Sequence, residues 1–157
     1  MATSAALGAC VGAARPDATF EDFVGDWRGR LRLPDGRDVG MSLEVSPVDG
    51  DAERFHWRLR YEGQDVRDYT LIVRDRPAGE AELNENNGVV LPTTLRAGAL
   101  ISVFEVQGAV LNVRYRLERG ALHFELESYR PDRGRPAGAR VRAWPSVAVQ
   151  RGLLRRW

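Results

Sequence analysis

Three residue types that catalytic and metal sites often use are absent or nearly absent from this chain of 157 residues. It contains no lysine, so all 23 basic residues are arginine, and it has one cysteine, Cys10, and two histidines. The absence of lysine excludes a Schiff-base lysine and the lysine of a phosphate-binding P-loop. A lone cysteine cannot form an internal disulfide, and with two histidines it does not make a structural zinc site. The composition therefore predicts no metal centre and no cofactor.

The chain also lacks a long hydrophobic run and a strong net charge. No stretch of about 18 apolar residues occurs, so no segment is expected to span a membrane as a helix. Charged residues make up 29% of the chain but nearly cancel to a net charge of +1, and we therefore expect no nucleic-acid partner. With 43% hydrophobic residues and the length of one ordinary domain, the chain can bury a core of its own.

The N-terminal segment leaves the cellular location open. Residues 1–19 are small and alanine-rich, and we expect them to form a flexible tail on a barrel domain of residues 20–157. The segment LGAC, which ends at Cys10, is similar to the lipobox at which bacterial lipoproteins are cleaved and acylated. Only nine residues precede Cys10 and none is basic, whereas a signal peptide has a charged start and an apolar stretch of about 7–15 residues. The two alternatives are a cytoplasmic protein and an envelope lipoprotein with a lipid anchor at Cys10.

The rest of the chain has the pattern of β-structure. From Asp26 onward apolar residues recur at every second position and turn residues every 8 to 12 positions, which is typical of a β-sandwich or barrel. A short helical turn is expected from Pro16 to Phe23. Expected strands run from Asp26 to Leu33, from Val39 to Ser46, from Phe55 to Glu62 and from Glu80 to Glu85, and a basic loop from Arg130 to Gly138 precedes a last strand from Arg140 to Leu154, broken near Trp144 and Pro145.

The last strand is long enough to return beside the first and close the sheet. The predicted fold class is therefore all-β: a single antiparallel up-and-down barrel of eight to ten strands, with a short N-terminal helical turn and no helical lid. Hairpin registers support this topology, because in three hairpins the register that places apolar pairs inside also places a charged pair outside. The expected pairs are Leu31 with Met41 and Arg28 with Glu44, Leu59 with Tyr69 and Arg60 with Asp68, Leu100 with Tyr115, and Tyr115 with Phe124 and Arg114 with Glu125.

One short motif resembles a known family. In the segment FVGDWRG, Phe23, Gly25 and Trp27 resemble the Gly-x-Trp signature that opens the first strand of lipocalins after a short helical turn. The resemblance implies a small, bacterial-type calycin barrel that binds small apolar molecules. It also implies that Trp27 packs across the barrel floor under a C-terminal arginine, Arg151 or Arg155. The chain departs from secreted lipocalins in lacking disulfides and a C-terminal helix, and its first loop, PDGRD, is too short for the helix-turn-helix of fatty-acid-binding proteins.

The inward positions of the expected strands are rich in large aromatic side chains. Such side chains can line an apolar pocket in which tyrosine hydroxyls orient a ligand, or they can simply fill the barrel. The candidate ligand-binding residues are Trp27, Met41, Phe55, Trp57, Leu59, Tyr61, Tyr69, Glu85, Leu100, Phe104, Tyr115 and Phe124. No catalytic residue is assigned, because His56 and His123 fall on outward positions and no serine has the partners of a catalytic triad.

Glu85 is the one acidic candidate. It shares the inward parity of Ala81 and Leu83 if its strand continues that far, and a carboxylate there would need a hydrogen bond or a cation. It then acts as a ligand contact or a general base, or else it caps a turn with Asn86 and Asn87. We expect non-enzymatic binding of a small, mostly apolar ligand. The alternatives are an isomerase-type enzyme that uses a buried carboxylate and a structural envelope lipoprotein with a filled barrel.

Overall fold

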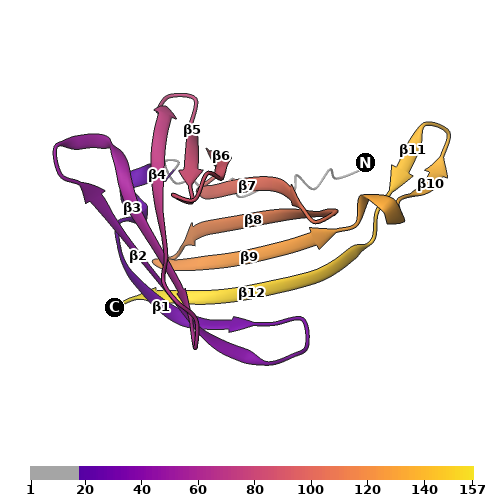
Figure 1. Cartoon of the computed structure of the whole chain (residues 1–157), viewed down its shortest axis with the longest axis horizontal. Coiled ribbons are helices and arrows are strands. Elements are labelled where there is room, and N and C mark those ends of the chain that lie inside the picture. Colours follow the sequence, from indigo (N-terminus) through magenta and orange to yellow (C-terminus); the bar gives the residue numbers. More distant parts are fainter. Residues whose placement is uncertain (1–17) are drawn as a thin grey trace, which may run out of the picture.

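A computed structural model describes residues 18–157 and shows a closed antiparallel β-barrel of ten strands (Figure 1). Its strands are β1 (Gly25–Arg32), β2 (Asp38–Val48), β3 (Asp51–Tyr61), β4 (Arg67–Asp75), β5 (Glu80–Asn84), β6 (Val90–Arg96), β7 (Ala99–Val106), β8 (Ala109–Glu118), β9 (Ala121–Tyr129) and β12 (Ser146–Arg156). Strands β1 to β9 each pair with their neighbours in sequence, and β12 closes the barrel between β9 and β1. The predicted fold class is confirmed.

Four further elements lie outside the barrel wall. The 3-10 turn η1 (Phe20–Phe23) precedes β1, and the 3-10 turn η2 (Pro131–Arg133) follows β9. Strands β10 (Arg135–Gly138) and β11 (Val141–Ala143) form a separate two-stranded hairpin between η2 and β12. Residues 33–37 alone connect β1 to β2, so the barrel has no helical lid there, as predicted. In the described part of the chain, no helix is long and apolar enough to cross a membrane.

Alternation of side chains along each strand builds the barrel. On β1, Trp27 and Leu31 are buried whereas Arg28 and Arg32 are exposed, because successive strand residues point to opposite faces of a sheet. Gly29 lies on the inner face, where an added Cβ would overlap the backbone carbonyl of Leu153 on β12. The absence of a side chain at this position thus lets β12 approach β1 and close the sheet.

The first two hairpins differ from their predicted registers by two residues. Leu31 pairs with Val39 rather than Met41, because Leu33 N donates to Arg37 O at 2.8 Å and tightens the turn. Leu59 pairs with Arg67 rather than Tyr69. A shift of two residues keeps every side chain on its expected face, so the inner and outer sets are unchanged.

In the β3–β4 hairpin the slip originates at the turn. Gln64 N donates to Tyr61 O at 3.0 Å, and Gly63 adopts a φ of +76°, so the turn is centred about one residue earlier than the sequence predicted, which shifts the register by two. Arg58, rather than Arg60, therefore lies opposite Asp68 and forms the ion pair with it at 3.5 Å. In the β1–β2 hairpin, likewise, Arg28 lies opposite Ser42 and not Glu44.

The hairpins of the second half have their predicted registers. Leu100 pairs with Tyr115, and Tyr115 pairs with Phe124. The turns at Gln107-Gly108 and Arg119-Gly120 have positive φ at both central residues, the geometry that matches the twist of two-residue hairpins. Arg114 lies opposite Glu125 as predicted, although the ion pair of Glu125 at 2.9 Å is with Arg151 of β12.

The end of the chain is partly as predicted. The last strand is interrupted before Ser146, at the expected Trp144-Pro145 break, and β12 then runs to Arg156. The expected basic loop from Arg130 to Gly138 instead contains η2 and β10. Of the expected helical turn, Phe20 to Phe23 are helical. Pro16 and Cys10 lie outside the described residues, so the tail and the lipid anchor remain predictions.

Candidate functional site

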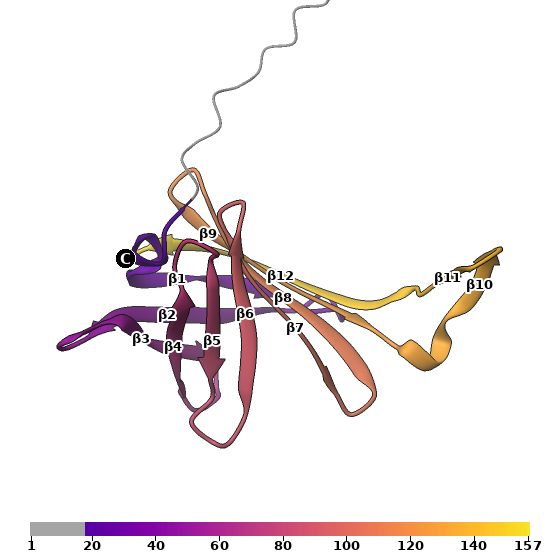
Figure 2. The same cartoon turned by 90° about the horizontal axis from the view of Figure 1, so that it is seen from above.

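The barrel has two different ends. The floor end carries η1, the β8–β9 turn and the last residues of β12, whereas the mouth end carries the β1–β2, β3–β4 and β9–β12 connections. Figure 2 shows η1 and the C-terminus together at one end of the molecule, away from the β10–β11 hairpin. Inward side chains toward the floor are almost fully buried, whereas several of those toward the mouth, such as Tyr61 and Leu126, are only half-buried.

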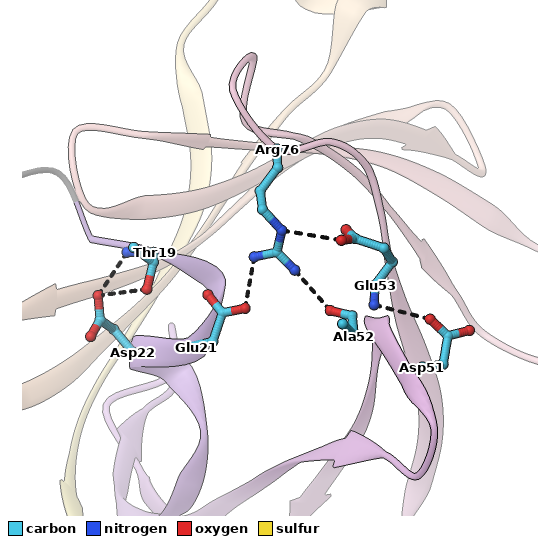
Figure 3. Close-up of polar contacts among 7 residues, drawn as sticks. All are labelled: Thr19, Glu21, Asp22, Asp51, Ala52, Glu53 and Arg76. Atoms are coloured by element: carbon cyan, nitrogen blue, oxygen red, sulfur yellow. Dashed lines mark hydrogen bonds and ion pairs between the residues drawn. The ribbon is translucent and has the colours of Figure 1, made fainter.

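Charged residues attach η1 to the barrel wall at the floor end (Figure 3). Arg76 donates to Glu21 at 2.7 Å, to Glu53 at 3.3 Å and to the backbone oxygen of Ala52 at 2.8 Å. The backbone N–H of Thr19 donates to the Asp22 carboxylate at 2.7 Å, which caps the short turn. These contacts hold Phe20 and Phe23, both buried, against the bottom of the core.

Trp27 and a C-terminal arginine also close the floor, as the lipocalin resemblance implied, but the arginine is Arg156. Its guanidinium carbon lies 4.7 Å from the Trp27 ring centroid, and it donates to Asp22 O at 3.1 Å. The expected Arg151 and Arg155 are wrong, because buried Leu154 fixes the parity of β12 and turns odd-numbered residues outward. Arg151 instead pairs with Glu125 on the outer face.

A chain of aromatic rings fills the middle of the barrel. Phe23 lies 6.2 Å from Trp57, Trp57 lies 5.0 Å from Tyr115 in an edge-to-face arrangement, and Tyr115 lies 5.1 Å from Phe124. The Trp57 Nε1 atom is buried and has no hydrogen-bond partner among the described residues. Burial raises the pKa of Tyr115 well above its usual value, so this phenol stays protonated.

Most of the candidate ligand-binding residues belong to this packed core. Those that are buried are Trp27, Met41, Phe55, Trp57, Leu59, Leu100, Tyr115 and Phe124. Tyr61, Tyr69 and Phe104 are half-buried and lie toward the mouth, where they pack against the core. The floor half therefore matches the alternative that side chains fill the barrel, whereas the mouth half does not.

An open cavity of about 450 Å³ lies at the mouth. Inward apolar side chains form its wall, and polar side chains from the connecting loops form its rim. The lining residues are Leu31, Leu33, Arg37, Val39, Tyr61, Glu62, Gln64, Arg67, Leu126 and Gln150. Tyr61 is the one member of this set that was also a candidate from the sequence.

Arg67 is the most distinctive residue of the mouth. It begins β4 opposite Leu59, on the same parity as the half-buried Tyr69. Its guanidinium carbon lies 5.0 Å from the Tyr61 ring centroid, and it donates to Gln64 Oε1 at 3.3 Å. Within residues 18–157, Arg67 forms no ion pair. The sequence signal was the alternation Arg67, Tyr69, Leu71, but Arg67 was not among the candidate residues.

Two tyrosines share the electrostatic environment of Arg67. Burial raises the pKa of Tyr61, and the positive charge of Arg67 opposes that rise. Burial and then the negative charge of Glu85 raise the pKa of Tyr69, whereas Arg67 lowers it. Both phenols therefore remain protonated near neutral pH and can donate hydrogen bonds beside a cation.

Glu85 lies at the turn after β5, which ends at Asn84, so the strand does not carry it inward. Its backbone N–H donates to Val89 O at 2.9 Å, and Asn87 Nδ2 donates to its carboxylate at 3.3 Å. Asn86 N donates to the side chain of Asn84 at 2.9 Å. These bonds match the turn-capping alternative, and the half-buried carboxylate is close enough to act on the pKa of Tyr69.

The remaining polar candidates lie elsewhere. His56 and His123 are on the outer face, where they pair with Thr70 and Arg116 of the neighbouring strands. Inside the barrel, the hydroxyls of Thr93 and Ser102 bond to each other at 2.7 Å. No group of three or more potential metal ligands occurs in residues 18–157.

Comparisons with known proteins support the fold and leave the family unassigned. No family model matches the chain, and no curated protein matches it either. Among solved structures, the chain is similar to an asparagine-to-glutamine mutant of the fluorescent protein UnaG. The TM-score is 0.50 and the sequence identity is 18%, and the alignment covers 87% of this chain and 96% of that one. At this identity the likeness shows a shared β-barrel fold and nothing finer.

Proposed function

We propose that this barrel binds a small, mostly apolar molecule in its mouth cavity, with an acidic group of the molecule beside Arg67. The observation that carries the proposal is the contrast between two leucines of β9. Leu122 and Leu126 both face inward, yet Leu122 is fully buried whereas Leu126 is half-exposed and lines the cavity. Apolar side chains facing an open cavity inside a barrel are a site for an apolar ligand.

The preference for an acid rests on Arg67. Its guanidinium lines the cavity and has no ion-pair partner in the described part of the chain, whereas Arg58 and Arg74 on the outer face of the barrel are each paired with a carboxylate. A carboxylate or sulfonate at the cavity rim would accept charge-assisted hydrogen bonds from Arg67. The protonated Tyr61 and Tyr69 can donate further hydrogen bonds to the same group.

The cavity is large enough for this role. Its volume of about 450 Å³ falls within the range of small-molecule sites, about 300–1,000 Å³. The packed aromatic core below it gives the cavity a firm apolar base, because such interiors are close-packed. Non-enzymatic binding is the proposal, since the Glu85 carboxylate accepts a hydrogen bond from Asn87 within a turn and nothing observed favours an isomerase.

The proposal is tested with 8-anilinonaphthalene-1-sulfonate, a fluorescent probe that combines an apolar body with one anionic group. The expected result is saturable binding by the native chain that weakens roughly tenfold in Arg67→Met, the loss expected for a charge-assisted hydrogen bond. Arg60→Met is the matched control, because Arg60 lies on the outer face of β3 and is exposed.

Two outcomes would contradict the proposal. One is no binding by a chain whose urea unfolding curve shows that it is folded. The other is equal binding by Arg67→Met and Arg60→Met. Trp144 lines an apolar groove outside the barrel, which is a second place for the probe to bind. Probe binding at the mouth should therefore be unchanged in Trp144→Ala. Native mass spectrometry of the protein from its own host would then report a natural ligand as added mass.

A further inference from the structure

The β10–β11 hairpin stands away from the barrel at the mouth end (Figures 1 and 2). It belongs to the connection from β9 to β12, and every residue of its two strands is exposed. We call residues 130–147, which comprise η2, the hairpin and the start of β12, the basic hairpin. It adds nothing to the barrel core, so its sequence is free to serve another purpose.

Charge is concentrated in the basic hairpin. Its charged residues are Arg130, Asp132, Arg133, Arg135, Arg140 and Arg142. Five arginines against one aspartate give it a charge of +4, whereas the whole chain carries only +1. Asp132 pairs with Arg130 at 3.1 Å, and no other arginine of the basic hairpin forms an ion pair within residues 18–157.

Apolar side chains accompany these arginines. Val141, Trp144 and Val147 expose 53%, 47% and 48% of their surfaces. An apolar groove of about 340 Å³, lined by Val110, Tyr129, Pro131 and Trp144, lies at the base of the basic hairpin. Trp144 is held in place, because its Nε1 donates to Pro131 O at 3.2 Å and its ring lies against Gly134, where an added Cβ would overlap it.

We propose that the basic hairpin docks the mouth end of the barrel onto an anionic lipid surface. Unpaired arginines are attracted to the negative potential of acidic lipid headgroups. Exposed tryptophan and valine side chains beside them can enter the boundary between headgroups and acyl chains, where tryptophan is enriched. A nucleic acid would match the charge but not the exposed valines, so a lipid surface fits both observations.

The experiment is flotation of the full chain with vesicles. Vesicles of phosphatidylcholine with added phosphatidylglycerol should bind the chain, and pure phosphatidylcholine vesicles should not. High salt should release the bound chain, because it screens exposed charges. Trp144→Ala should weaken binding severalfold, and the tryptophan emission of the native chain should shift to the blue on binding only while Trp144 is present.

A matched pair of double variants tests the location. Arg135→Glu/Arg140→Glu should weaken vesicle binding roughly tenfold or more. Arg119→Glu/Arg155→Glu makes the same change in net charge at the floor end and should bind like the native chain. The pairs are matched in backbone as well, since Arg119 and Arg140 both have positive φ and Arg135 and Arg155 both lie on strands. Urea midpoints check that all variants fold.

Three outcomes would overturn the proposal: equal binding to both kinds of vesicle, equal loss in both double variants, and displacement of the chain from vesicles by an RNA of mixed sequence at low concentration. The last outcome would assign the surface to nucleic acid instead. Because vesicle binding needs no ligand in the cavity, the result is independent of the test with the fluorescent anion.

Discussion

The floor and the mouth of this barrel are built from the same strands yet differ in packing. At the floor, η1 brings Phe20 and Phe23 under the core, and Arg156 covers Trp27. At the mouth, short connections leave the inner face open, and a cavity of about 450 Å³ remains. Alternation along the strands therefore decides which side chains point inward, whereas the elements at the two ends of the barrel decide whether the interior is filled.

The largest effect should come from truncating leucines on β9. Leu122→Ala removes a fully buried side chain and should lower the free energy of unfolding by about 2–5 kcal/mol, the range for cavities in packed cores. Leu126→Ala, the same substitution on the same face, should lower it by only about 1 kcal/mol, because water already reaches that side chain. Urea denaturation measures both, and equal losses would show that the two halves are packed alike.

A second comparison concerns the glycines that close the sheet. Gly29→Ala places a methyl group against the carbonyl of Leu153, and the required shift of β12 should lower the free energy of unfolding by about 1–3 kcal/mol. In Gly40→Ala the added methyl group meets only the flexible side chain of Glu62 at 3.2 Å, so the free energy of unfolding should change little. Thermal and urea unfolding measure the stability of the two variants. A Gly29→Ala variant as stable as the native chain would contradict the close approach of β12 to β1.

Alkaline pH should weaken the core through Tyr115. Its pKa is raised in the folded chain above the ordinary 10.0, so the folded state keeps a proton that the unfolded state loses. The stability that this contributes is complete below pH 10 and should fall by about 1.4 kcal/mol for each further pH unit. Unfolding midpoints between pH 8 and 11 measure the slope, which should become shallower in Tyr115→Phe; an unchanged slope would argue against burial of this phenol.

A smaller effect is expected at the floor network. Arg76→Met removes the contacts to Glu21, Glu53 and the Ala52 oxygen and should lower the free energy of unfolding by about 1 kcal/mol, because the ion pairs are largely exposed. High salt should shrink the difference from the native chain. Arg74→Met, which loses an exposed pair with Glu82 on the barrel wall, is the control and should cost less.

The smallest effect should appear at the mouth rim. Glu85→Gln removes a negative charge that raises the pKa of Tyr69, so that pKa should fall while the pKa of Tyr115 stays the same. Ultraviolet titration of tyrosinate absorbance, with Tyr69→Phe to assign the signal, measures the change. No movement of the Tyr69 signal would mean that Glu85 lies away from the mouth.

The sequence predicted the features of this fold that local rules control. Period-two alternation placed Trp27 and Leu100 inside, and the Gln107-Gly108 and Arg119-Gly120 turns gave correct registers, because two-residue turns admit few geometries. The register of the β1–β2 hairpin was harder to predict, because a longer loop can close at either of two positions. The loop consists of the three residues Pro34 to Gly36 and not of the five residues PDGRD. The slips of two residues here and at the Gly63 turn kept each side chain on its expected face.

The candidate site was less predictable because it depends on where packing stops. Nothing in the alternation distinguishes Leu122 from Leu126, so the sequence could indicate the inner face but not the half of it that remains open. Arg67 and Arg156 were missed although their parities with Tyr69 and Leu154 were present in the sequence. The expected last strand ended at Leu154, too early for the alternation to reach Arg156, and Arg67 was not singled out among the inward positions.

We expect the mouth half of the barrel interior to be open to ligand and the floor half to be closed. Nuclear magnetic resonance of the full chain, titrated with 8-anilinonaphthalene-1-sulfonate, tests it residue by residue. We expect the resonances of Tyr61, Arg67 and Leu126 to shift as the probe is added, and the resonances of Trp27 and Leu122 to stay unchanged. Shifts confined to the outside of the barrel, or spread equally to the floor, would contradict it.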